Sequence, residues 1–524
     1  MHIFLSLSRR ARLITRAAPV NVAPQSNRSE AQMKWIFRTL GVLTLVIGVL
    51  VAIMVGRASR DGRTRTIIAS APKIEVDTDA AARRLAGAVR FRTISWDGKP
   101  DASADEFLAL HDYLEKSYPA AHRVLKREKV GQFSLLYTWQ GSDAALKPIM
   151  LMAHQDVVPI APGTEKNWAH EPFSGDIADG FVWGRGAWDD KSNLLAVLEA
   201  VEKLASAGAQ PKRTIYIASG HDEEVGGPRG ATQIAKLLDQ RGVKLEFVID
   251  EGMIVTSGVI PGVAKPIALI GLAEKGSTTV SIAAEGAPGH SSMPPAASRI
   301  GEVAQALAKL EAHQMPSRLE GVARASLEAL APEMGGLNRL VLSNLWIAAP
   351  LARKALEKSP ASAAMMRTST ALTVFNAGEK SNVLPGKAEA IVNFRNAPGD
   401  SIESVLHHVR YTIGNPLLKV AAVGVSREAS PVSPADSDAY RLIERTIRET
   451  MPEAVVAPGL VIAGTDSRQM SGLTTNVYRF VPVRAGPGDL ARFHGTNERI
   501  GVDNYAEIIR FFHRLISVSA IEGK

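Results

Sequence analysis

The longest apolar stretch of the chain lies near its N-terminus. Residues 39–56 contain no charged side chain and are mostly Leu, Val, Ile and Ala. A stretch of about 18 such residues predicts a helix that crosses a membrane. Lysines and arginines precede it, which favours an inside location for the basic N-terminal segment 1–38. We therefore expect a single-pass membrane anchor with the rest of the chain extracytoplasmic, in the periplasm or outside the cell.

Two other interpretations of the 39–56 stretch stay open. A cleaved signal peptide has a similar composition, but no small-x-small cleavage site follows Ile53, so we favour an uncleaved anchor. A buried helix of a soluble protein is the other alternative. Four arginines, at 57, 60, 63 and 65, follow the stretch and weaken the orientation argument. The sequence also leaves open whether translation starts at Met1 or Met33.

After a predicted linker at 57–76, the apolar pattern becomes that of an α/β protein. Short apolar runs at 148–153, 214–218 and 247–249 predict buried strands. Between the first two, apolar residues recur at helical spacing and predict a helix over 190–205. Strands that alternate with helices predict a three-layer domain whose sheet is mostly parallel and covered on both faces.

The pattern changes after about residue 275. Segments 278–284 and 388–395 alternate between apolar and polar residues, which is typical of half-exposed strands, and helical spacing lies between them. The earlier pattern then returns and ends in a predicted helix over 505–516. These shifts predict an α/β domain made of 77–274 and 426–524, with an α+β domain inserted at 275–425.

Composition narrows the classes of function. Of the 524 residues, 46% are hydrophobic and 22% are charged, as in ordinary globular proteins. The net charge of +8 is concentrated around the predicted anchor, and aromatic and basic residues do not interleave, so we expect no nucleic-acid partner. The absence of cysteine excludes disulfides, a thiol nucleophile and thiolate metal ligands. A Gly-x-Ser-x-Gly elbow of serine hydrolases is also missing.

Four polar clusters adjoin the predicted strands and helix. They are the segments 154–159 (His-Gln-Asp-Val-Val-Pro), 184–191 (Gly-Arg-Gly-Ala-Trp-Asp-Asp-Lys), 221–227 (His-Asp-Glu-Glu-Val-Gly-Gly) and 250–252 (Asp-Glu-Gly). In parallel α/β sheets, ligands bind beyond the carboxyl ends of the strands, so the four clusters are predicted to meet at one edge of the sheet. Each cluster alone is typical of an ordinary turn or helix end; the ordered series is what indicates a site.

Paired carboxylates are the informative part of these clusters. Several acids gathered at one edge would repel one another strongly, and divalent cations relieve that repulsion. Without cysteine, the ligands must be His and carboxylate, which suits zinc, cobalt or manganese. Two ions that share one carboxylate fit the number of acids available. Two histidines and three carboxylates around two ions leave about one positive charge, which a bound hydroxide would neutralise.

At this point the motifs resemble a known family. Besides the clusters above, the resemblance is carried by 172–175 (Pro-Phe-Ser-Gly), 289–292 (Gly-His-Ser-Ser), 382–385 (Asn-Val-Leu-Pro), 464–468 (Gly-Thr-Asp-Ser-Arg) and 493–498 (Phe-His-Gly-Thr-Asn-Glu). Together they resemble the zinc aminoacylase and carboxypeptidase family, in the branch of carboxypeptidase S and its secreted N-acyl-amino-acid hydrolase relatives. The resemblance extends from about residue 77 to the C-terminus and does not include the predicted anchor.

The resemblance implies two metal sites with a shared carboxylate. It implies His154, Asp189 and Asp250 as ligands of one zinc, and Asp189, Glu224 and His494 as ligands of the other. Asp250 and Glu251 are neighbours, and either could be the ligand; Asp250 is our first choice. His494 rests on the resemblance alone, because it is more than 200 residues away from the other ligands.

The resemblance also implies roles for residues that do not bind metal. Glu223 would be the general base, and Asp156 would orient the ring of His154. His290 would stabilise the oxyanion across the interface of a homodimer formed through the inserted domain, which would serve as a lid. Candidates for substrate binding are Asn382, Arg395 and Arg468, the last as a bidentate partner of a substrate carboxylate.

The sequence therefore predicts a hydrolase of amide bonds adjacent to a free carboxylate, in short peptides or N-acyl amino acids. The reverse condensation uses the same site and is not distinguished. An inactive binding homologue is an alternative, although such a protein would be expected to lose Glu223 or Asp189, and both are present. A protein that binds anionic surfaces or nucleic acid is the remaining alternative.

Overall fold

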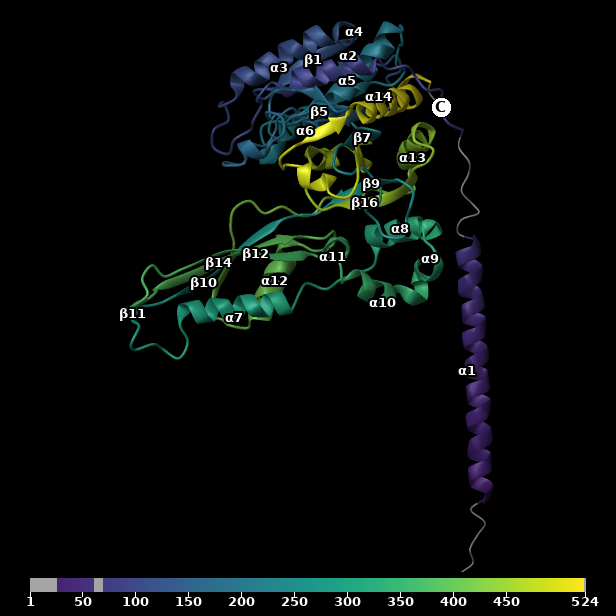
Figure 1. Cartoon of the computed structure of the whole chain (residues 1–524), viewed down its shortest axis with the longest axis vertical. Helices are drawn as coiled ribbons and strands as arrows, with labels where there is room; N and C mark the ends of the chain where they lie inside the picture. The colour runs from purple at the N-terminus through teal and green to yellow at the C-terminus, as the bar shows by residue number, and fades with distance from the viewer. Residues whose placement is uncertain (1–25, 61–68, 523–524) are drawn as a thin grey trace, which may run out of the picture.

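The computed structural model describes residues 26–60 and 69–522. Figure 1 shows a body built from the early and late parts of the chain, a second unit from its middle part, and a long helix, α1 (Ser26–Arg60), standing beside both. The predicted anchor lies within α1, whose portion Gln32–Arg60 is long and apolar enough to cross a membrane; its most apolar window is not buried by the rest of the protein, although Ala58 near its end is. Residues 1–25 of the predicted basic segment and 61–68 of the predicted linker lie outside the described residues.

The body contains a ten-stranded mixed sheet. Its strands, in spatial order, are β1 (Leu125–Val130), β2 (Ser134–Trp139), β6 (Ile215–Ser219), β3 (Ile149–Met152), β7 (Phe247–Asp250), β17 (Val477–Arg479), β9 (Ile267–Glu274), β8 (Val255–Thr256) and β18 (Arg484–Ala485), with β16 (Val455–Val461) paired to β9. The central strands β6, β3, β7 and β17 are parallel, as predicted. Towards the edge β1 and β2 are antiparallel, because only three residues join them and a parallel pair needs a long crossover.

Helices cover both faces of this sheet, which gives three layers. Alternate residues of β3 enter two different cores: Ile149 and Leu151 pack in one, Met150 and Met152 in the other. The helices around the body are α2 (Thr78–Val89), α3 (Ala104–Ser117), α4 (Pro119–Val124), α5 (Lys191–Ser206), α6 (Ala231–Gln240), α13 (Asp438–Thr450) and α14 (Val502–Ile516). Because β3 is buried on both sides, its sequence is continuously apolar, and the site must lie at the strand ends.

The second unit has its own sheet and its own core. The sheet order is β12 (Ser369–Ala377), β14 (Lys387–Arg395), β10 (Thr278–Glu285) and β15 (Lys419–Ala422), and the helices are α7 (Arg299–Ala312) and α12 (Ile402–Ile413). Along β14, Ala388, Ala390, Val392 and Phe394 point into the core that these helices cover. This is the alternation seen in the sequence. A two-stranded ribbon, β11 (Gly289–His290) with β13 (Val383–Leu384), forms the far tip of the unit (Figure 1).

Four short helices lie between the two strand-rich parts of the middle segment. They are α8 (Gly321–Leu330), α9 (Gly336–Leu342), α10 (Leu345–Leu356) and α11 (Pro360–Met366). Apolar residues of α8, α9 and α10 form a core with Val455 and Ala457 of β16. This stretch of the predicted 275–425 domain therefore packs on the ten-stranded sheet and lies beside α1 (Figure 1).

Candidate metal centre

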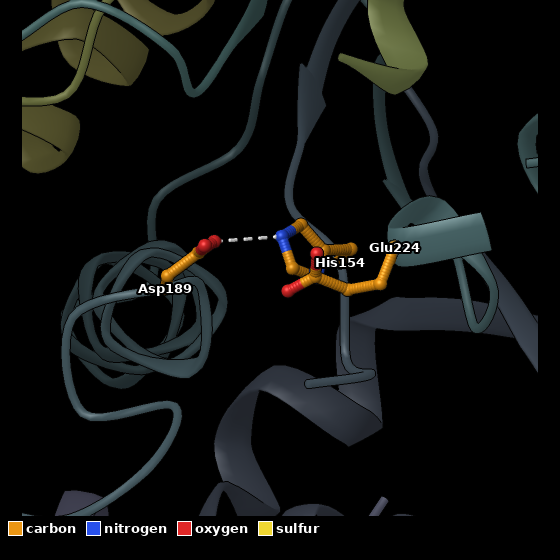
Figure 2. Close-up of side chains that lie close together, drawn as sticks. All are labelled: His154, Asp189 and Glu224. Carbon is orange, nitrogen blue, oxygen red and sulfur yellow. Dashed lines mark hydrogen bonds and ion pairs between the residues drawn. The ribbon is translucent and has the colours of Figure 1, made fainter. Parts of the chain in front are cut away.

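The predicted clusters meet at one edge of the sheet, where those of His154 and Glu224 follow the parallel strands β3 and β6. His154 comes two residues after β3, Asp189 shortly precedes α5, and Glu224 lies in the turn after β6. One ligand atom from each of these three residues can be chosen so that all lie within 4.8 Å of one another. Figure 2 shows the imidazole of His154 facing the carboxylate of Asp189, with the side chain of Glu224 extending to the His154 ring from its own turn. The sequence prediction that these residues converge is matched by this geometry.

Asp189 lies between two imidazoles. Its Oδ1 is 2.9 Å from Nε2 of His154, and its Oδ2 is 2.9 Å from Nε2 of His494. The Nε2 atom of His494 is also 3.3 Å from Oε2 of Glu224. Each oxygen of one carboxylate thus faces a different ring, which is the arrangement that a carboxylate bridging two cations requires.

The other ring nitrogen of His154, Nδ1, contacts Asp156. This nitrogen lies 2.9 Å from the backbone oxygen of Asp156 and 3.4 Å from that residue's carboxylate. The carboxylate in turn accepts hydrogen bonds from the backbone N–H groups of Glu223 (3.2 Å) and Glu224 (3.1 Å). A proton on Nδ1 leaves Nε2 free to bind a cation, and Asp156 fixes both the ring and the acidic turn around it.

The electrostatics of the cluster favour a bound cation. Enclosure of Glu224 raises its pKa to about 7, helped by the nearby charge of Asp189. Burial raises the pKa of Glu223 well above its ordinary value, and neighbouring acids add to this. Hydrogen bonds to Asp189 and Glu224 raise the pKa of His494 to about 10. The cluster therefore holds more carboxylates than its imidazoles can balance at neutral pH.

The Oε1 atom of Glu224 also favours a bound cation. It is buried and has no hydrogen-bond partner, while the Glu224 side chain as a whole is 6% exposed. A buried carboxylate oxygen without a donor is costly, and a cation at that position would remove the cost. The donor set of imidazoles and carboxylates suits zinc and similar divalent ions.

His494 reaches the cluster through a small three-stranded sheet. In it β19 (Arg499–Gly501) pairs antiparallel with β5 (Phe181–Trp183), which also pairs with β4 (Ile177–Ala178). The residues just before β19 therefore meet the residues just after β5, and those two segments carry His494 and Asp189. His494 has a φ of 57°, in the left-handed region, and follows a turn at the surface.

Arg185 and Glu498 connect the segments that carry Asp189 and His494. Both are buried, at 2% and 0% exposure, and the Arg185 guanidinium forms an ion pair with the Glu498 carboxylate. Arg185 also donates to the backbone oxygens of His494 and Gly495, each at 3.1 Å. Both residues lie in motifs recognised in the sequence, but their role was not predicted.

Comparison with known proteins identifies the family of the chain. Residues 150–518 match the model of peptidase family M20/M25/M40. The chain belongs to this family. It is 42% identical over 439 residues to probable carboxypeptidase S-like 2 of Dictyostelium discoideum, covering 83% of this chain and 84% of the relative. It is 41% identical over 444 residues to an N-fatty-acyl-amino acid synthase/hydrolase of Danio rerio, and the match covers 83% of this chain and 85% of that relative. The resemblance seen in the sequence is confirmed.

Solved structures show the same fold. A family metallo-carboxypeptidase from Sulfolobus solfataricus, Sso-CP2, superposes with a TM-score of 0.62 at 18% identity, covering 83% of this chain and 98% of that one. At this identity the likeness establishes the α/β fold of the peptidase family. It does not assign roles to individual residues.

Asp250 and Glu251 have different surroundings at the end of β7. The Oδ2 atom of Asp250 accepts a hydrogen bond from the backbone N–H of Ser467 at 2.8 Å. Burial raises the pKa of Glu251 well above its ordinary value, and repulsion from the charge of Asp189 is the next largest cause. Asp189 is not among the main influences on Asp250. The charge of Asp189 therefore acts more strongly on Glu251 than on Asp250.

A pocket of about 290 Å³ opens beside the cluster. Its lining joins the acidic residues Glu223 and Glu224 and the imidazole of His494 to four cationic residues, which are Lys275, Arg395, Arg427 and Arg468. Arg395 and Arg468 were predicted to bind substrate, and the structure places both in this lining. Lys275 and Arg427 were missed, since neither lies in a motif that marks it; Arg427 is positioned by a β-bridge between its backbone and Ser277.

His290 and Asn382 lie apart from the cluster. They meet in the two-stranded ribbon at the tip of the second unit, where the backbone N–H of Ser291 donates to the backbone oxygen of Asn382 at 3.2 Å. His290 is exposed, and its Nδ1 is 2.8 Å from the Ser292 hydroxyl. Within one chain the structure brings these two residues to each other and not to the cluster.

Proposed function

We propose that the protein hydrolyses an amide bond adjacent to a free carboxylate, in short peptides or N-acyl amino acids, with the aid of two divalent metal ions. Zinc is the first candidate, and cobalt and manganese are the others. The observation that carries the proposal is Asp189, whose two oxygens each lie 2.9 Å from a different imidazole. The relatives named above act, by name, on peptides and on N-fatty-acyl amino acids, which are both amides of an amino acid.

The ions would share Asp189 as a bridge. His154 would complete one site together with an acid from the end of β7, and Glu224 and His494 would complete the other. The surroundings of the two acids favour Glu251 over our first choice, Asp250, because Asp250 already accepts the Ser467 N–H. When bound, such ions lower the pKa of a water molecule and polarise a carbonyl group.

Glu223 is the candidate general base. Its backbone is fixed by the Asp156 carboxylate, and its side chain lines the pocket next to Glu224. Burial raises the pKa of the Glu223 carboxyl above its ordinary value, and a raised pKa favours acceptance of a proton. Glu223 would take a proton from the attacking water and deliver it to the leaving amine.

The cationic side of the pocket would bind the substrate carboxylate. Arg395 and Arg468 approach it from the second unit and from the body, and a guanidinium pairs with a carboxylate through two parallel hydrogen bonds. Arg427 would add a third guanidinium and Lys275 an ammonium group. This arrangement explains why the proposed substrates carry a free carboxylate next to the amide that is cut.

His290 and Asn382 would act in a second copy of the chain. In a homodimer formed through the second unit, the ribbon tip of one copy would reach the pocket of the other, where His290 would stabilise the oxyanion. The support is their joint position at the tip, away from the cluster of their own chain (Figure 1). The same unit would then serve as a lid.

We further propose that α1 anchors the protein in a membrane with the body outside the cytoplasm. The portion of α1 from Gln32 to Arg60 contains an apolar window that the rest of the protein leaves unburied, and it is free of acidic residues. Its apolar side chains would lose their contact with water in the bilayer core.

The proposed activity is tested on the purified full-length chain in detergent. N-acyl amino acids, glycyl dipeptides and matched amides with a blocked carboxylate are supplied with zinc, and release of the free amino acid is measured. We expect turnover of the free-carboxylate substrates only, loss of turnover with EDTA, and recovery with added zinc or cobalt. Turnover that survives prolonged chelation would overturn the metal mechanism, and metal binding without any turnover would indicate the inactive binding homologue.

A further inference from the structure

Helices α9 and α10 expose a row of large apolar side chains. Leu337 of α9 is 71% exposed, and on α10 Trp346, Ile347 and Leu351 are 47%, 44% and 61% exposed. Ile347 and Leu351 are four residues apart and share one side of α10, and Trp346 lies next to Ile347, while Leu345 and Ala352 are buried in the core beneath. A folded protein rarely leaves such a row in water, so the row indicates a contact with another apolar phase.

Helices α9 and α10 are joined to the C-terminal end of α1 by hydrogen bonds. The Arg339 guanidinium donates to the backbone oxygen of Ala58 at 2.8 Å, and the Asn344 amide donates to the backbone oxygen of Met54 at 3.0 Å. The Trp346 indole N–H then donates to the Asn344 side chain at 3.1 Å. These bonds connect the exposed tryptophan to the last turns of the apolar stretch.

The position of this attachment along α1 is informative. Residues 54–58 are the place where the apolar stretch ends and Arg57 and Arg60 begin. If α1 crosses a bilayer, this place lies at the boundary between the hydrocarbon and the head groups. The α9–α10 pair is therefore held at that depth, on the side of the body that faces α1 (Figure 1).

Charge adds a separate argument. Arg353, Lys354 and Lys358 lie at and just beyond the C-terminal end of α10, and all three are exposed; the one acid among them, Glu357, follows the helix and pairs with Arg367. Apolar residues with a tryptophan on one side and a fringe of Lys and Arg are typical of helices that lie flat in the head-group region. Basic residues there are attracted by anionic lipid heads.

We propose that α9 and α10 form a membrane-contact surface, with Leu337, Trp346, Ile347 and Leu351 inserted at the head-group level of a bilayer that contains anionic lipid. The inference rests on the proposed anchoring by α1. Its consequence is that the body is held against the membrane instead of moving freely on a linker.

The absence of cysteine makes a direct test possible. Three single-cysteine chains, Leu351→Cys, Val46→Cys and Leu108→Cys, are labelled with an environment-sensitive fluorophore and placed as full chains in nanodiscs with anionic lipid. Val46 reports on the anchor. Leu108 is a matched exposed leucine of α3, on the far side of the body from α10 (Figure 1). Each chain is exposed to lipids that carry a nitroxide near the head group or deep in the acyl chain, and to iodide in the water.

The label at 351 is expected to lose fluorescence with the head-group nitroxide and to be shielded from iodide, while the label at 108 shows the reverse. Quenching of the 351 label by iodide alone, with the 46 label quenched by the deep nitroxide, overturns the surface and leaves the anchor intact. Shielding of the 351 label without quenching by nitroxide lipid means that a protein covers this surface, which also overturns the inference. A 46 label that no lipid quenches overturns the anchor itself.

Discussion

The Oε1 atom of Glu498 lies 3.1 Å from the backbone nitrogen of Asp189, which donates a hydrogen bond to it. The same oxygen accepts the N–H groups of Gly186 and Trp188, each at 2.9 Å. Glu498 thus fixes the backbone that presents the Asp189 carboxylate, while its ion pair with Arg185 fixes the backbone of His494. Two segments that are about 300 residues apart in the chain are held in one geometry by this buried pair.

Replacing Glu498→Gln keeps an oxygen acceptor for the three N–H groups but leaves Arg185 buried without its countercharge. Breaking a buried ion pair in this way costs about 3–5 kcal/mol of unfolding free energy. We also expect metal affinity to fall roughly 10- to 100-fold, as for other residues that orient metal ligands. Thermal unfolding and metal competition with a chromophoric chelator measure the two effects.

The matched control is Glu328→Gln, which breaks an exposed pair with Arg324 on α8. Such a pair contributes about 0.3–0.5 kcal/mol, so this variant should unfold and bind metal like the parent. Equal metal affinity in the Glu498 variant and the control would show that the buried pair stabilises the fold without positioning the ligands.

Glu223→Gln is expected to lower kcat by roughly 10²- to 10⁴-fold, since the amide cannot accept the proton of the attacking water. Metal content, measured by elemental analysis, should stay at the parental value because Glu223 is not among the proposed ligands. A variant with parental kcat would remove Glu223 from the mechanism, and one that loses metal would make it a ligand.

The acid at the end of β7 is identified by a pair of variants. If Glu251 is the ligand, Glu251→Gln loses one equivalent of metal and Asp250→Asn keeps both, with some loss of stability because the Ser467 N–H then faces a weaker acceptor. The reverse pattern would establish Asp250 as the ligand, the first choice from the sequence. Metal stoichiometry by elemental analysis after gel filtration decides between them.

Lys275 should make substrate binding depend on pH. Burial lowers the pKa of Lys275 to about 8, so its ammonium group is charged below pH 8 and neutral above it. Because Lys275 lines the cationic side of the pocket, KM for a free-carboxylate substrate should rise as pH increases through about 8. Lys275→Met should show a higher KM that no longer changes over this range. A KM that rises equally in both proteins would assign the effect to another group.

Much of the catalytic layout could be predicted from the order of elements. The strands β3, β6 and β7 and the helix α5 were expected within a few residues of their observed bounds, because continuous apolar runs and helical spacing are local properties of the chain. Once these strands are parallel, the residues that follow them must share one edge. The convergence of His154 and Glu224 follows from that rule, whereas Asp189 follows β5 of the small antiparallel sheet and reaches the same place through that sheet.

Other features have no local signal. Arg427 reaches the pocket through a single β-bridge with Ser277, and the buried Arg185–Glu498 pair depends on strands β5 and β19, which are far apart in the chain. The choice between Asp250 and Glu251 depends on which side chain the Ser467 N–H engages. Neighbouring acids have the same composition and nearly the same position, so only their orientation in the folded chain separates them.

The sequence by itself determined the α/β pattern, the acidic clusters and the family, because periodicity, residue type and motif order are written along the chain. Only the tertiary structure decided which atoms face each other: that Asp189 lies between two imidazoles, that His290 lies away from them, and that α9 and α10 attach to α1. The physical reason is that pairing and packing between distant segments set these relationships, and such contacts leave no periodic trace in either segment.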